Sequence, residues 1–245
     1  NAIDNVEGNP DDAEDDNGHG SHVTSIILSS RRAQGSGNTP KWNGVAPGVS
    51  LVAVKAFDED GHGSYMDVIR GIDWVVQNKD AYGIRVLNLS LSAPPRSHYW
   101  DDPLNQAVMA AWDAGIVAVA SAGNSGPLPM SIGVPGNVPY VITVGAMTDN
   151  RTPLDASDDS VTSFSAAGPT YEGFVKPEIL APGGHVLGLM ASYSTLPQDY
   201  PEFYDGGKTA LLAQARRQNV EPVAGSDAAR RRPAPPAADG PELLP

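Results

Sequence analysis

Apolar and polar positions follow two alternating patterns from residue 19 to about residue 190. Residues 64–83 carry apolar residues at spacings of three and four, which places these residues on one face of a helix. Residues 116–123 form a short continuous apolar run rich in β-branched residues, and such a run indicates a buried strand. Together the patterns predict helices at 21–30, 64–83 and 101–115 and strands at 49–57, 84–92, 116–123 and 140–147.

Continuous apolar strands that alternate with amphipathic helices are typical of an α/β fold. They predict a doubly wound, mostly parallel sheet with helices on both faces. Gly83 suits the C-terminal cap of one helix, and residues 101–115 begin with an Asp cap and a Pro in the first turn. Ligands bind such sheets at the carboxyl ends of the strands. Those ends carry the polar motifs NLSLS (88–92) and SAGNSGP (121–127) and the loop that contains His19.

Composition restricts the function classes. The 245 residues include no cysteine, which excludes disulfides, thiolate zinc sites and cysteine nucleophiles. The net charge of −13 argues against a nucleic-acid partner, whereas an acidic surface is compatible with a structural calcium ion. No run of 18 apolar residues predicts a membrane span, and the first residues do not have the pattern of a signal peptide.

The chain divides into three segments by composition. Residues 1–13 are acidic, residues 14–205 have the composition of a folded domain, and residues 206–245 are rich in Ala, Arg and Pro. The last segment has no Ile, Phe, Tyr or Trp, so it buries too little apolar surface to offset its ordering entropy. We expect residues 206–245 to be disordered and not to pack on the domain. Their arginines should then be accessible to proteolysis.

Two motifs suggest metal sites, and both fail on spacing. A zinc site of the HExxH type needs histidines four residues apart with a glutamate between them, but His19 and His22 are three apart with none. A calcium loop of the EF-hand type that began at Asp58 would need an acid at Ile69. The sequence therefore predicts no protein metal site. On residues alone, His19 is either a catalytic base or an exposed loop histidine, and Asn124 is either an oxyanion donor or a turn residue.

Seven motifs resemble one known family when they are taken in order. They are DDNGHGSHV, NGVAPGVSLVAVKAF, VLNLSLS, VASAGNSGP, VPGNVPYVITVGA, FSAAGP and VKPEILAPG. Together these motifs resemble the subtilisin-like serine proteases (subtilases), particularly their bacterial intracellular-type branch. The resemblance covers residues 14–190 and implies a serine endopeptidase that requires no cofactor and binds a peptide or protein substrate in extended conformation.

The resemblance also implies a role for each matching residue. His19 would be the general base, and Asn124 would be the oxyanion donor. The substrate strand would comprise Ser90, Leu91 and Ser92, with Ser92 in place of a common glycine, which narrows the pocket rim. Ala122 and Gly123 would form the pocket wall. In the same family segment the proline is cis, so we expect a cis Val134–Pro135 peptide bond.

Two elements of the family pattern are not found. The triad aspartate should lie in a D-[ST]-G motif well before the histidine, and Asp4 has neither the motif nor the spacing. The nucleophilic serine should lie in G-T-S-M-A, and Ser226 in AGSDAA is a poor match. We therefore interpret the chain as a partial, inactive subtilase domain with an unpaired strand edge and exposed apolar surface.

Several alternatives remain beside that interpretation. One is a non-catalytic module of the same fold that binds extended peptides. A nucleotide-binding domain is disfavoured because neither G-x-G-x-x-G nor a Walker motif is present. The oligomeric state stays open, and so does the choice between a secreted and a cytoplasmic bacterial protein.

Overall fold

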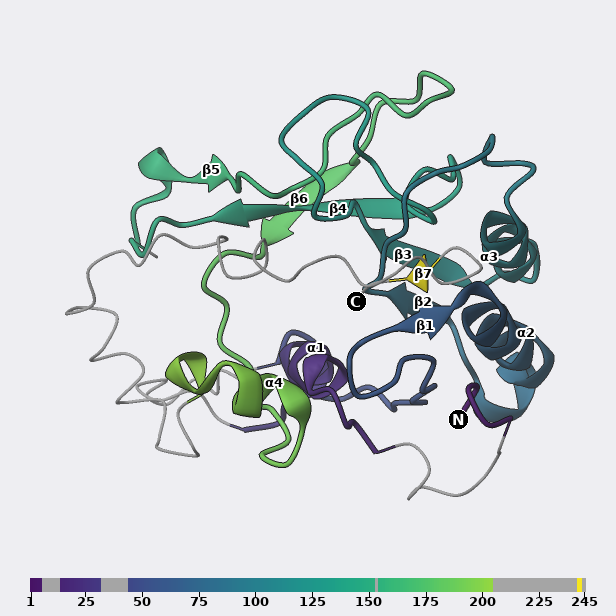
Figure 1. Cartoon of the computed structure of the whole chain (residues 1–245), viewed down its shortest axis with the longest axis horizontal. Coiled ribbons are helices and arrows are strands. Elements are labelled where there is room, and N and C mark those ends of the chain that lie inside the picture. Colours follow the sequence, from purple (N-terminus) through teal and green to yellow (C-terminus); the bar gives the residue numbers. More distant parts are fainter. Residues whose placement is uncertain (6–13, 32–43, 153, 205–241, 244–245) are drawn as a thin grey trace.

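A five-stranded sheet forms the centre of the computed structural model, which describes residues 1–5, 14–31, 44–152, 154–204 and 242–243 (Figure 1). Its strands are β2 (Val86–Leu89), β3 (Val117–Ser121), β4 (Ile142–Thr148), β5 (Ser160–Val161) and β6 (Ile179–Pro182). The β2–β3, β3–β4 and β4–β6 pairs are parallel, and β5 pairs antiparallel with β4. The sheet is thus mixed but mostly parallel, as the sequence pattern predicts.

Four α-helices accompany the sheet in the described ranges, and the ends of α2 and α3 follow local sequence signals. They are α1 (His19–Leu28), α2 (Tyr65–Tyr82), α3 (Pro103–Asp113) and α4 (Thr195–Asp199), with short 3₁₀ turns at Ala156–Asp158 and Pro201–Phe203. Helix α2 begins with a reciprocal capping box between Ser64 and Asp67 and ends at Gly83 in the left-handed conformation. Asp102 caps the start of helix α3, and its carboxylate accepts hydrogen bonds from the Leu104 and Asn105 N–H groups.

One face of the sheet is well covered. Helices α2 and α3 pack against each other and over this face, and their apolar residues form the main core with the strands. Leu104, Val108 and Ala111 of α3 are fully buried, as are Ala118 and Ala120 of β3. Along β3 the alternation of small and β-branched residues sends every second side chain into this core.

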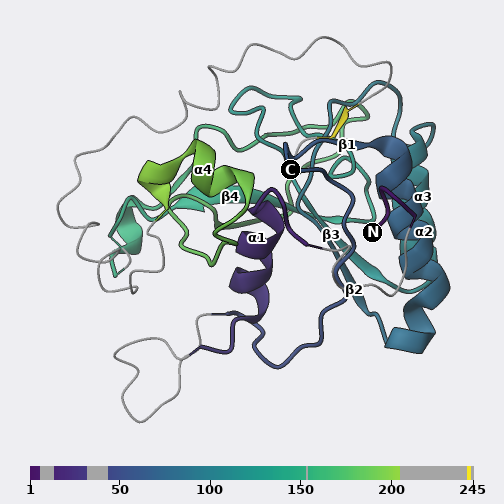
Figure 2. The same cartoon turned by 60° about the horizontal axis from the view of Figure 1, so that its bottom comes forward.

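The opposite face of the sheet is largely open among the described residues. Val86, Val117, Ile142 and Ile179 lie in neighbouring strands and are 59%, 47%, 39% and 52% exposed. Helices α1 and α4 lie on this side of the sheet (Figure 2), but α1 has no buried residue. Helices therefore flank both faces, while a row of apolar side chains on one face stays uncovered by the described chain. We call these four residues the open face.

The predicted strand at 49–57 does not form. Val49 and Leu51 are about half exposed, and no described strand pairs with this segment. A β-branched apolar run becomes a strand only when a neighbour satisfies its backbone groups. The Lys55 carbonyl accepts a backbone bond from the Ala2 N–H (2.7 Å), and the Val49 N–H donates to the Ala46 carbonyl (3.3 Å). Strand β2 likewise has β3 as its one described neighbour.

Two predictions about particular segments have different outcomes. The Val134–Pro135 peptide bond is cis, as expected. Of residues 206–245 the structure describes Glu242–Leu243, which form β7 and pair antiparallel with β1 (Gly63–Ser64). For those two residues the expectation of a tail that does not pack on the domain is wrong. The rest of the tail, including its arginines, lies outside the described residues.

Candidate functional site

The loop before α1 presents His19 at the first position of the helix. Gly18 precedes it with a φ of 106°, in the left-handed region that favours glycine. The Asp15 carboxylate accepts hydrogen bonds from the Gly18 N–H (2.8 Å) and the Ser21 N–H (2.5 Å), and so satisfies backbone donors of the first turn. The Asn17 side chain accepts a further bond from the His19 N–H (3.2 Å). This local network fixes the start of α1 and with it the position of His19.

The imidazole of His19 is held neutral by its surroundings. Burial lowers its pKa below the ordinary value, the nearby His22 lowers it further, and the charge of Asp15 opposes both effects. The pKa of His22 is also lowered, mainly by burial. A neutral imidazole can accept a proton, which a general base requires.

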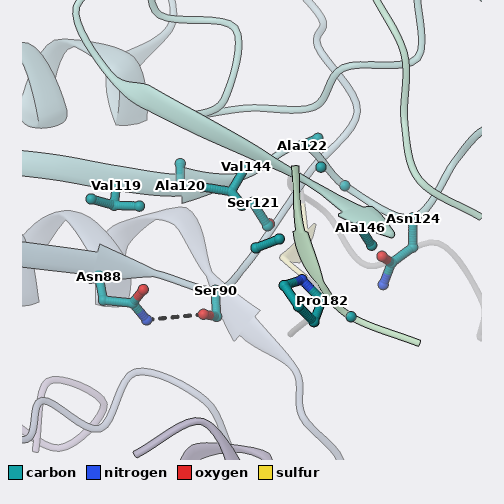
Figure 3. A pocket seen from close by; sticks show the side chains of 14 residues that line it. Asn88, Ser90, Val119, Ala120, Ser121, Ala122, Asn124, Val144, Ala146 and Pro182 are labelled. Atoms are coloured by element: carbon teal, nitrogen blue, oxygen red, sulfur yellow. Dashed lines mark hydrogen bonds between the residues drawn. The ribbon is translucent and has the colours of Figure 1, made fainter. Parts of the chain in front are cut away.

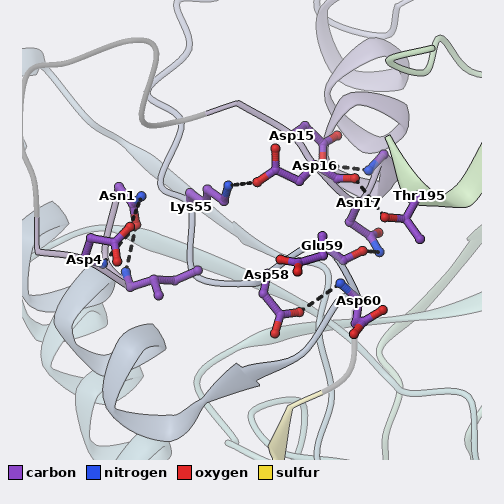
Figure 4. A network of polar contacts seen from close by, with 12 residues as sticks. Asn1, Asp4, Asp15, Asp16, Asn17, Lys55, Asp58, Glu59, Asp60 and Thr195 are labelled. Atoms are coloured by element: carbon purple, nitrogen blue, oxygen red, sulfur yellow. Dashed lines mark hydrogen bonds and ion pairs between the residues drawn. The ribbon is translucent and has the colours of Figure 1, made fainter. Parts of the chain in front are cut away.

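Long-range contacts tie the histidine loop to the rest of the domain (Figure 4). Asp16 forms an ion pair with Lys55, and the Asn17 amide donates to the Glu59 carbonyl (3.1 Å). On the other side of the loop, the Asp16 carbonyl accepts a hydrogen bond from the Thr195 N–H (2.8 Å). The start of α4 therefore holds the loop from one side and residues 55–59 hold it from the other.

An open cleft with a volume of ≈ 260 Å³ lies at the carboxyl ends of the strands (Figure 3). It is lined by Asn88, Ser90 and residues 119–124, 144–146 and 181–183. Its position agrees with the general location of ligand sites in parallel α/β sheets. It opens on the same side of the sheet as the open face, because Val119 and Val144 of its lining lie two residues after Val117 and Ile142 on the same strands, and residues two apart share a face.

Asn124 stands at the rim of this cleft. It follows β3 in a tight turn in which Gly123 has a φ of 102°. The Asn124 side chain is exposed and makes no hydrogen bond to any described residue, so its amide N–H groups are available to a ligand. Both the turn and the cleft thus suit a donor for developing negative charge.

The segment after β2 forms one wall of the site. The Ser90 hydroxyl accepts a bond from the Asn88 amide (2.9 Å), and the Leu91 carbonyl accepts one from the Ser121 hydroxyl (2.9 Å). Leu91 itself is buried, and Ser92 packs between Gly123 and Gly133. The opposite wall contains Ala122, which is buried and is bonded through its backbone to Val144 and Gly133.

The structure brings some predicted site residues together and separates others. Ser90, Ala122, Gly123 and Asn124 line one cleft, and Leu91 and Ser92 lie directly behind it. His19 is not among the residues that line the cleft.

Neither poor match for the missing triad residues gains support. The Asp4 carboxylate accepts a bond from the Asn1 amide (2.9 Å). The carboxylate that acts on His19 belongs to Asp15. Ser226 lies outside the described residues.

Sequence reasoning missed three residues of the site. Asn88 and Ser121 line the cleft, and Asp15 sets both the helix start and the charge near His19. A signal for the first two exists, because each is a polar residue at an alternate position of an otherwise apolar strand. Asp15 stood in a run of acids in which no single member was distinguishable.

No three His, Asp or Glu side chains in the described part of the chain gather as a group that could hold a metal ion. None of the helices described combines the length and the apolar composition that a membrane crossing needs.

Comparison with known proteins defines the class. A sequence model of the subtilase family matches residues 1–229. Among curated relatives, serine protease AprX of Bacillus subtilis (strain 168) is 42% identical over 185 residues, which cover 74% of this chain and 41% of AprX. Subtilisin DY of Bacillus licheniformis is 37% identical over 187 residues, covering 76% of this chain and 56% of that protein.

Solved structures agree with the sequence relatives. Sphericase superimposes with a TM-score of 0.58 at 29% identity, covering 73% of this chain and 56% of its own. The S41 psychrophilic protease gives a TM-score of 0.56 at 31% identity, covering 71% of this chain and 54% of its own. The fold is thus that of a subtilisin-like protein.

The chain belongs to the subtilase family of serine proteases. It spans about half the length of the curated relatives that it matches.

Proposed function

We propose that this chain carries the substrate-binding half of a subtilisin-like serine endopeptidase site, and that its 245 residues alone bind extended peptides without hydrolysing them at a useful rate. The observation that carries the proposal is the cleft. It combines an exposed amide donor, Asn124, with the polar rim at Ser90 and the backbone wall of Ala122 and Gly123. An extended peptide would add along residues 90–92 as a further strand.

In the proposed reaction, His19 is the general base and Asn124 stabilises the oxyanion. The lowered pKa of His19 keeps its imidazole neutral and able to take a proton from a nucleophile. A donor N–H of Asn124 would bond the oxygen that becomes negative when a carbonyl carbon is attacked. Residues 90–92 would hold the substrate in place through backbone hydrogen bonds.

Peptide binding without hydrolysis is favoured by two observations on this chain. A general base takes a proton only from a nucleophile within about 3 Å, and His19 does not line the cleft. The sequence also contains no Gly-Thr-Ser, the family context of the nucleophile. These observations support the second candidate function, a non-catalytic peptide-binding module, for the chain as it stands.

The test combines an activity probe with a restored enzyme. The purified chain is treated with a fluorophosphonate and with a chromogenic peptide, and we expect neither labelling nor turnover. Stoichiometric labelling that Ser226→Ala abolishes would show a recruited serine and overturn the proposal.

The second arm adds a D-[ST]-G segment before the chain and a G-T-S-M-A segment after residue 204. We expect hydrolysis to appear and His19→Ala to abolish it. Asn124→Ala should lower turnover by ~10²–10³, the loss found when a subtilisin, a member of this family, loses its oxyanion donor. Restored activity that survives His19→Ala would refute the assigned role of His19.

A further inference from the structure

A group of aromatic side chains lies on the surface just before α3, outside the cleft. The His98 and Trp100 rings stack with their centroids 4.4 Å apart, Tyr171 packs against His98 at 5.2 Å, and Tyr99 meets Trp100 edge-on. Trp100 and Tyr171 are 48% and 66% exposed. We call His98, Trp100, Tyr171 and the neighbouring Glu172 the aromatic patch. Contiguous exposed aromatic surface of this kind is typical of an interaction site.

The Glu172 carboxylate is buried beside these rings with one oxygen unpaired. Its side chain is 5% exposed. Oε1 accepts a hydrogen bond from the Tyr99 N–H (2.9 Å) and lies 3.6 Å from the His98 Nδ1, whereas Oε2 is buried and accepts no bond from any described residue. A buried acceptor without a donor costs free energy. This oxygen therefore favours a ligand that brings a donor, and a cationic donor most of all.

A tight turn holds Glu172 in place. The Thr170 N–H donates to the Phe174 carbonyl (2.9 Å), and the Gly173 N–H donates to the Thr170 carbonyl (2.9 Å). Gly173 has a φ of 89°, in the left-handed region that favours glycine. The Phe174 ring packs edge-on against Tyr99 with centroids 5.7 Å apart. The carboxylate is thus positioned before any ligand arrives, which lowers the entropic cost of binding.

The two nearest cations of the chain do not pair with this carboxylate. Lys176 forms its ion pair with Glu178. The charge of Arg96 acts on the Tyr65 hydroxyl. Within the described ranges neither of them forms an ion pair with Glu172. The patch is therefore an acidic and aromatic surface without a cation of its own.

Charge and shape together select a guanidinium as the ligand. The segments that build the patch, residues 98–101 and 171–174, contain Asp101 and Glu172 but no Lys or Arg, and the whole chain carries a net charge of −13. A guanidinium has N–H donors and no acceptor, which matches a buried carboxylate oxygen. Its plane also stacks on aromatic faces, which an ammonium group does less well.

We propose that the aromatic patch binds an arginine side chain of a peptide or protein partner, with the guanidinium stacked on Trp100 and Tyr171 and bonded to Glu172. None of the patch residues lines the cleft that contains Asn124. The site is therefore separate from the cleft, and the inference does not rest on the proposed function. A partner that occupied both places would be held at two points, which raises affinity without a new contact in the cleft.

The experiment is an NMR titration of the 245-residue chain with N-acetylargininamide. The reporters are the Trp100 indole N–H and the Tyr99 backbone N–H that donates to Glu172. The Trp74 indole on α2 is the internal reference. We expect saturable shifts at both reporters and none at the reference. The citrulline analogue keeps the shape without the charge and should bind about tenfold more weakly, and the lysine analogue should also bind more weakly because it lacks the planar fork.

Two pairs of variants locate the contacts. Glu172→Gln should weaken arginine binding about tenfold, whereas Glu202→Gln, the same change at an exposed position outside the patch, should leave it unchanged. Trp100→Leu, followed at the Tyr99 N–H, should weaken binding about 2- to 30-fold through the lost cation–π contact. Its matched control is Trp112→Leu, since Trp112 is 47% exposed but stacks on Tyr140 instead.

The ligand comparisons use the unaltered chain, so they do not depend on the folding of any variant. Equal affinity for the arginine and citrulline analogues would overturn recognition of the charge, and equal affinity for the lysine analogue would overturn the choice of a guanidinium. Shifts caused by methyl glucoside but not by arginine would assign the patch to a sugar and overturn the proposal. So would unchanged reporters in all titrations, or an arginine affinity that survives Glu172→Gln. Each of these results leaves the cleft and its proposed peptide binding untouched.

Discussion

The exposed apolar side chains of the open face should make this chain self-associate and bind hydrophobic dyes, and three substitutions should weaken both effects. We consider Val86→Thr, Val117→Thr and Ile142→Thr combined in one protein. All three positions lie on strands of the central sheet and are 59%, 47% and 39% exposed. Threonine keeps the β-branched shape that strands favour, so the sheet itself should survive the change.

The magnitude follows from the exposed apolar area. Full burial of a Val or Ile side chain contributes about 1.5–3 kcal/mol, so each half-exposed side chain leaves roughly 1 kcal/mol available to whatever covers it. Each threonine removes at least one methyl-sized group, at about 0.8 kcal/mol apiece. The triple variant should therefore lose roughly 2 kcal/mol of binding free energy at this face, which lowers the affinity for a dye or a second copy about 30-fold.

The assay is binding of a hydrophobic dye, with sedimentation velocity to measure self-association. We expect the unaltered chain to bind the dye and to self-associate, and the triple variant to do both about 30-fold more weakly. The matched control is Val45→Thr, Val49→Thr and Val175→Thr, at positions that are exposed but lie outside the sheet. Dye binding that stays unchanged in the face variant, or falls equally in the control, would refute the reasoning.

Three further predictions concern stability and titration. Asp102→Ala should destabilise the fold by roughly 2–4 kcal/mol, because it removes the α3 cap and leaves the buried Tyr65 hydroxyl without its hydrogen-bond acceptor. In urea unfolding, the double variant with Tyr65→Phe should lose less stability than the sum of the losses of the two single variants. Glu178→Ala should cost roughly 3 kcal/mol in the same assay, since the side chain of Lys176 is 1% exposed and loses the carboxylate that pairs with it; an unchanged midpoint would contradict this. Because the pKa of His19 is lowered in the folded chain, the stability that its neutral form contributes is present above the unfolded pKa of about 6.5 and is lost as pH falls below it. His22→Gln should move the NMR titration midpoint of His19 upward, and a downward shift would contradict the assigned cause.

Helix ends were predictable because their signals are local. Ser64 and Gly83 at the ends of α2, and Asp102 before α3, act through the nearest backbone groups, and the structure confirms both helices. The sequence could not show that the predicted strand at 49–57 does not form, because strand pairing depends on a neighbour distant in the sequence. Local composition gives no information about that neighbour.

In the candidate site, too, the features set by local sequence were predictable and those set by distant contacts were not. Ser90 and Asn124 could be placed together because both follow parallel strands, and the ends of such strands share one edge of the sheet. The position of His19 outside the cleft lining could not be read from its motif. The motif fixes the turn at Gly18, whereas the placement of α1 depends on contacts with residues far along the chain.

Those contacts impose an order on the making of the protein. The histidine loop is held by the Thr195 N–H on the Asp16 carbonyl and by the Leu196 N–H on the Asn17 carbonyl, so the partners are separated by 179 residues. Closing a loop of that length in an otherwise unstructured chain costs about 4–5 kcal/mol, and such contacts form late in folding. On the ribosome, the loop at residues 15–18 cannot make these contacts until residue 196 has left the exit tunnel. The loop that carries His19 therefore receives its contacts with α4 late, and a chain released before residue 196 has the local network at Asp15 and Asn17 without the bonds from Thr195 and Leu196.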